Sequence, residues 1–554
     1  MEKNGAQIII ECLVEQGVDT VFGYPGGAVL HIYDELYKNS DRINHILTAH
    51  EQGASHAADG YARATGKVGV CIATSGPGAT NLVTGIATAY MDSVPMVAIT
   101  GNVGTSLLGK DSFQEVDIAG ITMPITKHNY IVKDVKDLAD TIREAFKIAS
   151  SGRPGPVLID IPKDITMNTC KYSPKTIKPA QTDHSNIKPE DIELLIKLIE
   201  KSKKPMIFAG GGIISSGSSQ ELLEFVEHTQ IPVTTSLMGT GGFPSTHKLY
   251  TGMLGMHGTM AANMGVTNAD LLIVLGARFS DRVTSDTKKF APYAKVVHID
   301  LDPAEIDKNV ESYHHIVGDV KEVLNTLTCG VPKQNRDKWI KQITDWKEEF
   351  PLKYQNGSSL RPQYIIEQIS EISKQEAIIT TEVGQHQMWA AQFYKYKDPR
   401  TFITSGGLGT MGYGTGASIG AQVGMPDKKV VHIAGDGSFR MNCNELATIS
   451  YYNIPVTIVI INNQVLGMVR QWQTLFYDNR HSQTTLDRGP DFVKLADAYD
   501  IEAYRVSTQE DFNTVFEKAY KSTSPVLIDC QVDQDEFVLP MVAPGAPIND
   551  LILD

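Results

Sequence analysis

The chain has 554 residues, of which 42% are hydrophobic and 21% are charged. This length exceeds what a single hydrophobic core supports, so we expect roughly three or four domains. The composition is that of a globular protein and excludes a disordered or collagen-like chain. Fifty Lys and Arg against 64 Asp and Glu give a net charge of −14, which argues against a surface for nucleic acid or an anionic membrane.

The sequence predicts neither a membrane span nor a secretory signal. The longest strongly apolar run, 456–461, is far shorter than the roughly 20 residues of a transmembrane helix. The first residues lack a basic segment followed by an apolar one. The six cysteines form no CxxC pair, and we expect them to be buried or free thiols in a reducing cytoplasm.

The first predicted elements follow an α/β pattern that recurs near the C-terminus. An apolar strand at 70–73 ends in a glycine turn, and another strand follows Pro95. The same order returns at 430–434 and after Pro455, with an Ala-Thr pair before each proline. A Pro-Val-Leu-Ile-Asp segment also occurs twice. Three matches in the same order indicate the duplication of one unit.

Between the repeats lies a third region with its own strand–glycine turns at 205–212 and 271–276. All three regions alternate short apolar strands with amphipathic helices, which is typical of parallel sheets. Polar stretches that contain Pro and Lys predict linkers at 171–189 and 346–362. We therefore expect three α/β domains with parallel sheets, the outer two related by duplication, at 1–170, 190–345 and 363–554.

Glycine turns after parallel strands place backbone N–H groups where phosphates bind. The segment 407–412 matches G-x-G-x-x-G, but no acidic residue lies at the expected strand end. The stretch from Gly60 to Lys67 is one residue too long for the phosphate-binding loop of nucleoside triphosphatases. After His50, the second histidine comes too late for a zinc peptidase. The sequence supports neither of these enzyme classes.

A more specific pattern joins two strand ends in the C-terminal region. Asp436 ends one predicted strand within Gly-Asp-Gly-Ser, and Asn463 ends the next one after a helix. In a parallel sheet those ends lie side by side at the carboxyl edge. Carboxylate and amide oxygens there suit Mg²⁺ and a diphosphate. Alone, Gly-Asp-Gly is as readily a simple turn and Asn-Asn a helix cap, but their spacing favours the magnesium site.

These two motifs resemble the fingerprint of thiamine diphosphate enzymes, and the resemblance extends over essentially the whole chain. More narrowly, the sequence resembles the catalytic subunits of the biosynthetic acetohydroxyacid synthase (acetolactate synthase) family. The resemblance implies a pyrimidine-binding N-terminal domain, a flavin-binding central domain and a diphosphate-binding C-terminal domain. The segments that carry it are 23–28, 50–53, 60–66, 74–81, 113–115, 162–164, 435–438, 462–463, 467–472 and 476–477.

The family reaction implied by this resemblance is a transfer between 2-keto acids. Pyruvate is decarboxylated on thiamine diphosphate, and the hydroxyethyl carbanion is joined to pyruvate or 2-oxobutyrate. The products would be 2-acetolactate or 2-aceto-2-hydroxybutyrate, the first common step of isoleucine, valine and leucine biosynthesis. Mg²⁺ and a structural, non-redox FAD are the other implied cofactors. The implied assembly is a cytoplasmic homodimer or dimer of dimers, with active sites between chains and a small regulatory subunit.

The resemblance also implies catalytic positions in the N-terminal domain. Glu51 matches the glutamate that hydrogen-bonds N1′ of the cofactor's aminopyrimidine, and its presence counts against the glyoxylate carboligase relative, in which this position is apolar. Phe113, Gln114 and Lys163 match residues of the substrate channel and of the side of the carbanion, contributed by the neighbouring chain. Gly27 matches a backbone position close to the reactive C2 atom.

In the C-terminal domain, the resemblance implies the contacts to thiamine diphosphate and its metal. Met411 matches the apolar wedge that bends the cofactor. The other matching cofactor positions in this domain are Val383, Gly384, Gln385, His386, Gly435, Asp436, Gly437, Ser438, Asn463 and Met468. The matching Mg²⁺ ligands are the side chains of Asp436 and Asn463 and the carbonyl of Val465.

The second substrate and the flavin are assigned in the same way. Arg282 matches the arginine that binds the acceptor carboxylate, although an arginine that serves the flavin or an ion pair stays an alternative. Trp472, with Met468 beside it, matches the residue that gives a preference for 2-oxobutyrate. The positions that match the flavin site are Arg153, Gly210, Gly211, Gly212, Met256, His257, Gly276, Ala277, Arg278, Arg282, Asp300 and Asp319.

Three other functions are weighed against this one. A flavin-dependent pyruvate oxidase shares the fold and both cofactors, but it has no second keto acid for Arg282 and Trp472 to hold. A simple 2-keto-acid decarboxylase is disfavoured because no paired histidines follow the N-terminal motifs. An inactive scaffold is disfavoured because Glu51 and the metal ligands are intact. The chain departs from the family pattern, with consequences for inhibitor sensitivity, at Asn102, Gly104, Thr105 and Ser106.

Overall fold

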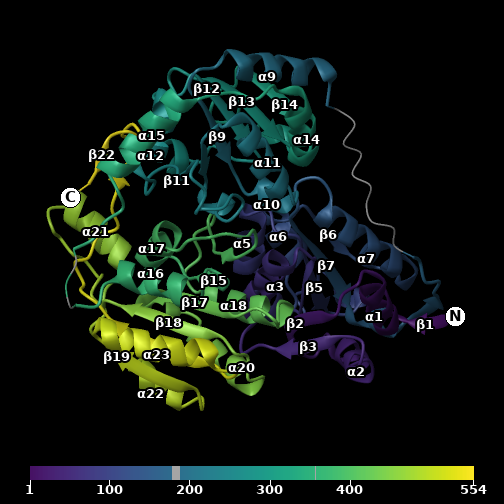
Figure 1. Cartoon of the computed structure of the whole chain (residues 1–554). Helices are drawn as coiled ribbons and strands as arrows, with labels where there is room; N and C mark the ends of the chain where they lie inside the picture. The colour runs from purple at the N-terminus through teal and green to yellow at the C-terminus, as the bar shows by residue number, and fades with distance from the viewer. Residues whose placement is uncertain (177–186, 356, 358, 554) are drawn as a thin grey trace.

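The protein is described by a computed structural model that covers residues 1–176, 187–355, 357 and 359–553. Part of the first predicted linker, 177–186, and positions 356 and 358 of the second lie outside the described residues. Figure 1 shows three α/β lobes, with the N-terminal domain on the right, the central domain at the top and the C-terminal domain at the lower left. Among the helices of the described part, none combines the length and apolar character needed to cross a bilayer.

The N-terminal domain is a six-stranded parallel sheet in the order β3-β2-β4-β5-β7-β6. Apolar side chains fill cores on both faces of this sheet, as expected for a buried parallel sheet. Its strands are β2 (Thr20–Tyr24), β3 (Asn44–Leu47), β4 (Gly69–Ala73), β5 (Met96–Asn102), β6 (His128–Ile131) and β7 (Pro156–Pro162). Its helices are α1 (Gly5–Glu15), α2 (Leu30–Lys38), α3 (Glu51–Thr65), α4 (Pro77–Asn81), α5 (Val83–Met91), α6 (Ile118–Thr122), α7 (Val135–Ser150) and α8 (Lys163–Met167).

The C-terminal domain repeats this topology, with the order β16-β15-β17-β18-β20-β19. When the strands of each outer domain are numbered in chain order, the second lies at one edge of the sheet and the sixth lies between the fourth and the fifth. Both domains share this order, which confirms the predicted duplication. Its strands are β15 (Ile378–Thr381), β16 (Phe402–Ile403), β17 (Val430–Gly435), β18 (Thr457–Asn462), β19 (Glu502–Val506) and β20 (Val526–Gln531). Its helices are α16 (Pro362–Ile372), α17 (Gln385–Phe393), α18 (Tyr413–Gly424), α19 (Asp436–Phe439), α20 (Leu446–Tyr451), α21 (Gly467–Phe476), α22 (Phe492–Asp497) and α23 (Gln509–Lys521).

The central domain has a different parallel order, β11-β10-β9-β12-β13-β14. Successive strands move outward from β9 in one direction and then from β12 in the other, which is the doubly wound order of dinucleotide-binding sheets. The strands are β9 (Pro205–Ala209), β10 (Val233–Thr235), β11 (Tyr250–Met253), β12 (Leu271–Leu275), β13 (Lys295–Asp300) and β14 (His314–Val317). The helices are α9 (Pro189–Lys201), α10 (Gly212–Ser215), α11 (Ser219–Thr229), α12 (Met260–Asn268), α13 (Asp281–Thr284), α14 (Val320–Gly330) and α15 (Asp337–Glu349).

The two outer domains pack on each other through α3 and α18, whose side chains join one apolar core. The backbones approach so closely that a Cβ on Gly60 would collide with the carbonyl of Ala417, and a Cβ on Gly420 with that of Ala57. Glycine at these positions is therefore a packing requirement. The contact fixes the N-terminal domain against the C-terminal domain of the same chain.

Two connections differ from or add to the sequence prediction. Helix α15 continues to Glu349, inside the predicted second linker, and Trp346 in its last turn packs edge-on against Trp339 in its first turn. After β20 the chain crosses to the central domain, where the Val542 N–H donates to the Met256 carbonyl at 2.8 Å. This terminal segment carries the short antiparallel strands β21 (Met541–Val542) and β22 (Leu551–Ile552).

Candidate active site

Most predicted site residues lie at the carboxyl edge of their sheet, because they follow a strand of a parallel sheet, whereas Arg153 precedes β7. In the N-terminal domain Gly27 follows β2, Glu51 begins the helix after β3, and Lys163 begins the helix after β7. A Cβ on Gly27 would meet no atom within 4 Å, so the space beside its backbone is open. No hydrogen bond or ion pair within the described chain joins Lys163 to Glu51.

Glu51 is half-buried at the first position of α3. Its Oε2 accepts a hydrogen bond from Asn81 Nδ2 at 3.0 Å. A Cβ on Gly78 would lie 3.2 Å from Glu51 Oε1, so this glycine leaves room for the carboxylate. Gln114 lies at the same turn with a left-handed φ of 58°, its backbone packed against Gly76. Glu51 and Gln114 therefore both lie against the turn that follows β4.

A second carboxylate, which the sequence analysis missed, reaches α3 from the C-terminal domain. Glu445 is fully buried, and its oxygens accept the backbone N–H groups of Ala49 at 3.1 Å and His50 at 3.0 Å. Burial raises the pKa of Glu445, while these N–H groups and the Thr448 hydroxyl act in the opposite sense. The contact fixes the backbone directly before Glu51.

In the C-terminal domain, two predicted segments meet at the point where the strand order reverses, between β15 and β17. The Ser438 hydroxyl donates to the Val383 carbonyl at 3.2 Å. The buried His386 imidazole lies against Gly435, where a Cβ would come within 2.6 Å of Nδ1. Burial lowers the pKa of His386 to about 3, and its Nε2 has no hydrogen-bond partner within the described chain. A buried, neutral imidazole nitrogen beside Gly435 is thus left without a partner among the described residues.

The predicted metal ligands come together at the same edge. Asp436 follows β17 and Asn463 follows the neighbouring β18, as predicted. Asp436 is 1% exposed, its Oδ2 accepts no hydrogen bond within the described residues, and its ion-pair partner Arg440 lies 3.7 Å away. Burial raises the pKa of Asp436 to about 7. A buried carboxylate with an unpartnered oxygen, at a strand end next to the one that Asn463 follows, fits a hard divalent cation.

Met411 is half-buried between two anchored positions. Gly412 donates its N–H to the fully buried Glu382 carboxylate at 2.7 Å, and its carbonyl accepts from Asn442 at 2.6 Å. Gly409 and Gly412 have left-handed φ values of 70° and 86°, which a side chain would strain. The Met411 side chain is therefore carried by a tightly constrained turn.

In the central domain, two of the predicted flavin turns touch at the reversal point between β9 and β12. A Cβ on Gly210 would collide with the Gly276 carbonyl, and a Cβ on Gly212 would lie 2.6 Å from the Gly276 Cα. Open α/β sheets bind ligands in this crevice. Met256, His257, Arg278 and Asp319 follow strands at the same edge, and Asp300 is the last residue of β13. These glycine turns and their position fit a dinucleotide such as FAD.

Two predicted arginines lie at domain contacts instead of in glycine turns. Arg153 of the N-terminal domain pairs with Asp302 at 3.2 Å and with Glu305 at 2.7 Å, beside the end of β13. Arg282 of the central domain lies over the Trp472 ring of the C-terminal domain, with Cζ 5.5 Å from the ring centroid. The Arg282 side chain is 60% exposed, so its guanidinium keeps donors free for an anionic ligand.

Three family models match successive parts of the chain. They describe the N-terminal thiamine pyrophosphate binding domain at residues 3–121, the central domain of thiamine pyrophosphate enzymes at 192–327 and the C-terminal thiamine pyrophosphate binding domain at 382–530. A probable acetolactate synthase large subunit from Methanocaldococcus jannaschii is 50% identical over 99% of this chain and 95% of its own length.

Acetolactate synthase large subunits from Pyropia yezoensis and Corynebacterium glutamicum are each 49% identical. The matches cover 98% and 99% of this chain and 94% and 90% of those proteins. The chain belongs to the acetolactate synthase large-subunit family. Its thiamine pyrophosphate domains account for the duplicated outer sheets, and the family's central domain accounts for the sheet between them.

In this member of the acetolactate synthase family, the structure adds two residues to the site that had no role assigned from the sequence. Asn81 lay within a recognised segment, but only the fold shows that it hydrogen-bonds Glu51. Gln471, fully buried beside Trp472, accepts from Gln385 at 3.0 Å and thereby ties α21 to the predicted diphosphate loop. A polar residue on the buried side of an otherwise amphipathic helix was the available signal.

Proposed function

We propose that the chain is the catalytic subunit of an acetolactate synthase. It would convert two pyruvates into 2-acetolactate and CO₂, or pyruvate and 2-oxobutyrate into 2-aceto-2-hydroxybutyrate. The observation that carries the proposal is the pairing of Arg282 with Trp472 close to an edge that holds Asp436 and Asn463. A cation beside an apolar ring suits a short 2-keto acid, which has a carboxylate at one end and an alkyl group at the other.

The C-terminal edge supports binding of the cofactor. Asp436, Asn463 and the Val465 carbonyl would hold Mg²⁺, and His386 and Ser438 would face the diphosphate. When bound, thiamine diphosphate would supply the nucleophilic carbon and the electron sink that decarboxylation of a 2-keto acid requires. Met411 would press against the cofactor from its constrained turn. FAD in the central domain would be structural, because the reaction has no net change in oxidation state.

Glu51 would hold a proton at N1′ of the aminopyrimidine. Its carboxylate is oriented by Asn81, and the backbone before it is fixed by Glu445. A positioned carboxylic acid can shift a proton onto a ring nitrogen with little rearrangement. Lys163, Gln114 and Gly27 would line the same edge on the side of the reacting carbon.

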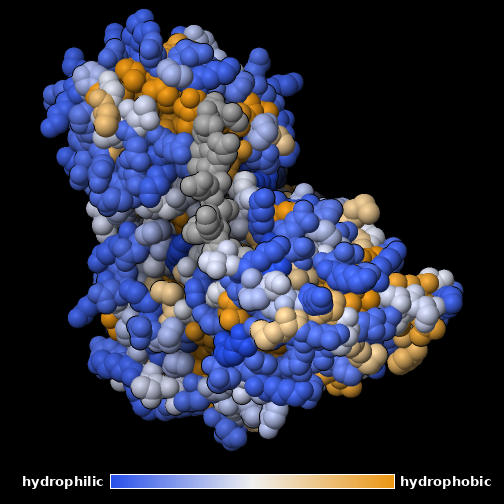
Figure 2. Space-filling model, turned by 90° about the vertical axis from the view of Figure 1, so that its right-hand side faces the viewer, coloured by the Kyte–Doolittle hydropathy of each residue, from blue (hydrophilic) through white to orange (hydrophobic). Residues whose placement is uncertain are grey.

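Exposed apolar side chains support a homodimer with the site between chains. Phe113 is 88% exposed and Leu30 55% exposed at the carboxyl edge of the N-terminal sheet, and Met441 is 57% exposed near Asp436. Figure 2 views the N-terminal side, where apolar residues in orange lie among polar ones on the lower part of the face. In a two-fold dimer, the exposed edge of the N-terminal sheet of one chain would cover the exposed edge of the C-terminal sheet of the other. A dimer of dimers, a small regulatory subunit and a cytoplasmic location complete the proposal, with the domain boundaries expected from sequence.

Product analysis tests the activity. The chain, loaded with thiamine diphosphate, Mg²⁺ and FAD, is given pyruvate alone and pyruvate with 2-oxobutyrate, and products and oxygen uptake are measured. We expect acetolactate in the first case and mainly acetohydroxybutyrate in the second, without oxygen uptake proportional to product. Acetyl phosphate or acetate formed with stoichiometric oxygen consumption would favour a pyruvate oxidase, and acetaldehyde alone would favour a simple decarboxylase.

A further inference from the structure

A buried charged network lies between the two outer domains of one chain and ends at the segment that carries Met411. On α3, Arg63 donates to Asp59 at 2.6 Å, and its other arm donates to Asp92 at 2.9 Å. The Tyr413 hydroxyl at the start of α18 also donates to Asp59, at 2.5 Å. The carboxylates of Asp59 and Asp92 are 0% exposed. Charges buried this deeply persist only when every oxygen is paired.

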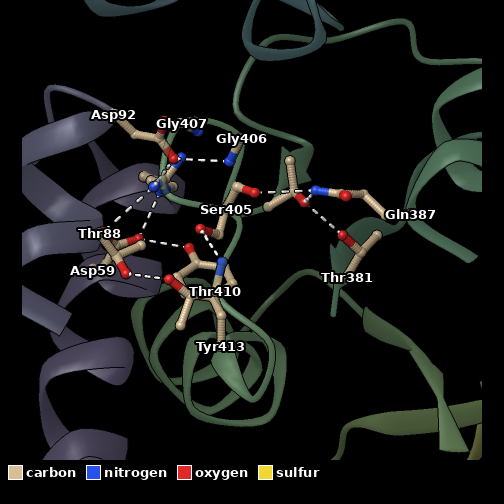
Figure 3. Close-up of polar contacts among 12 residues, drawn as sticks. Asp59, Thr88, Asp92, Thr381, Gln387, Ser405, Gly406, Gly407, Thr410 and Tyr413 are labelled. Carbon is tan, nitrogen blue, oxygen red and sulfur yellow. Dashed lines mark hydrogen bonds and ion pairs between the residues drawn. The ribbon is translucent and has the colours of Figure 1, made fainter. Parts of the chain in front are cut away.

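Asp92 connects this network to the C-terminal domain. Its Oδ2 accepts the Gly406 N–H at 3.0 Å, and its Oδ1 accepts the Gly407 N–H at 2.7 Å. A Cβ on Gly407 would lie 2.8 Å from that Oδ1, so only glycine lets the backbone approach. Figure 3 shows Asp92 and Thr88 reaching from the N-terminal domain on the left to this segment.

The same segment is held at further points on the way to Met411. Thr88 and Thr410 share a hydroxyl hydrogen bond of 2.7 Å, and the Thr410 N–H donates to Ser405 Oγ at 3.0 Å. On the other side Gln387 donates to the Ser405 carbonyl at 3.1 Å. Asp92 and Thr88 of the N-terminal domain thus contact three of the five residues that precede Met411. This is more restraint than domain packing alone requires, since α3 and α18 already make that contact.

We propose that Asp92, charged and anchored by Arg63, is a positioning residue for Met411. It holds 406–410 so that the Met411 side chain is pre-arranged against the cofactor before binding. The inference rests on the proposed function, since it assumes that Met411 contacts thiamine diphosphate. It assigns to the pyrimidine-binding domain a second role, exerted within its own chain on the cofactor wedge.

The test compares the affinity of the chain for thiamine diphosphate in four proteins, at fixed Mg²⁺ and FAD. Asp92→Asn places an amide donor against N–H donors, and Thr88→Val removes only the hydroxyl contact. Asp270→Asn is the matched control, because Asp270 likewise accepts two successive N–H groups, those of Lys203 at 2.8 Å and Lys204 at 3.1 Å, away from the segment. Tryptophan fluorescence gives the Kd, and near-ultraviolet circular dichroism reports how the bound cofactor is held.

We expect the Kd for thiamine diphosphate to rise about tenfold in Asp92→Asn and about threefold in Thr88→Val, with a weaker dichroism band and unchanged FAD content. Asp270→Asn should bind as the wild type does. Wild-type Kd and dichroism in Asp92→Asn, even with a lower melting temperature, would overturn the inference. If Asp92→Asn does not fold, Thr88→Val decides in the same way. A wild-type chain that binds no thiamine diphosphate would overturn the proposed function as well.

Discussion

The outer domains and the central domain each carry a candidate ligand site at the carboxyl edge of a six-stranded parallel sheet, but the sites are built differently. The outer sheets share one strand order, and the edge of each holds a carboxylate, Glu51 or Asp436. At the central reversal point the backbones of Gly210 and Gly276 meet, and a Cβ on Gly210 would collide with the Gly276 carbonyl. The outer edges are therefore suited to proton transfer and metal binding, and the central crevice to holding a ligand through its backbone.

The difference also explains how the three domains contact one another. The outer domains share an apolar core through α3 and α18, and Glu445 and Asp92 connect each of them to the edge of the other. The central domain meets its neighbours through the ion pair of Arg153 with Glu305, through Arg282 over Trp472, and through Met253, which joins the apolar core of the C-terminal domain. Removal of a side chain should thus reduce catalysis most in the outer domains. In the central domain, the largest loss of ligand binding is expected when an added side chain fills the space between two backbone segments.

The largest effect is expected for Glu51→Gln. The amide can still hydrogen-bond N1′ but cannot hold its proton, so turnover should fall by about 10²–10⁴-fold. Binding of thiamine diphosphate and Mg²⁺ should stay within a few-fold, because their predicted ligands lie in the C-terminal domain. Proton exchange at the cofactor's C2, followed by NMR, measures the step directly. An unchanged exchange rate would remove Glu51 from the assignment.

The central domain should be most sensitive at Gly210. In Gly210→Ala the new methyl would collide with the Gly276 carbonyl and force the two turns apart. We expect flavin content after dialysis to fall at least about tenfold, since the two turns would no longer form one crevice. Gly265→Ala is the control, because its methyl would meet only the flexible end of Met206. Equal flavin content in both variants would contradict the backbone account of this site.

A smaller effect is expected for acceptor choice. Cutting Trp472 to Leu removes apolar contact with one methylene of 2-oxobutyrate, worth roughly 1–3 kcal/mol or about 10–200-fold in selectivity. In competition with fixed pyruvate, the ratio of acetohydroxybutyrate to acetolactate, divided by the ratio of 2-oxobutyrate to pyruvate, should fall toward one. Trp339→Leu, in the core of the central domain, should lower stability and leave the ratio unchanged. A wild-type ratio in folded Trp472→Leu would contradict the assignment of Trp472 to the acceptor pocket.

The smallest effect concerns Glu382, which holds Gly412 beside Met411. Burial raises the pKa of Glu382 from 4.5 to about 7. Because the folded-state pKa is the higher one, the carboxyl stabilises the fold most below pH 4.5, and this contribution is lost as pH rises through 7. The melting temperature of wild type should therefore fall, relative to that of Glu382→Gln, by about 5 °C between pH 4.5 and 8. A pH-independent difference between the two proteins would contradict a buried, titrating Glu382.

Local patterns were sufficient to predict most of the fold. Continuous apolar strands with glycine turns located β4 and β17, the repeated Pro-Val-Leu-Ile-Asp segment located β20, and the order of the repeats predicted the shared topology of the outer domains. The positions of Asp436 and Asn463 on neighbouring strands followed from parallel pairing alone. Helix α15 runs to Glu349, past the predicted start of the linker at 346, because Trp346 packs against the apolar core that Trp339 joins.

Contacts between domains were beyond the reach of such patterns. Glu445 looks like an ordinary helix-start residue in the sequence, and Asp92 a turn residue before Pro95. Their partners, His50 and Gly407, are separated from them by hundreds of residues. Only the packing of α3 on α18 brings these groups together, and glycine spacing on those two helices was the one local sign of it.

Mixing two inactive variants tests most directly whether the outer domains form one catalytic site from two chains. Glu51→Gln and Asp436→Ala are each purified, dissociated, mixed in equal amounts and reassembled with thiamine diphosphate, Mg²⁺ and FAD. In half of the dimers one site would contain both wild-type residues, so acetolactate formation should return to about a quarter of the wild-type rate. Activity no higher than that of either variant alone, in mixtures shown to exchange subunits, would contradict a site shared between chains.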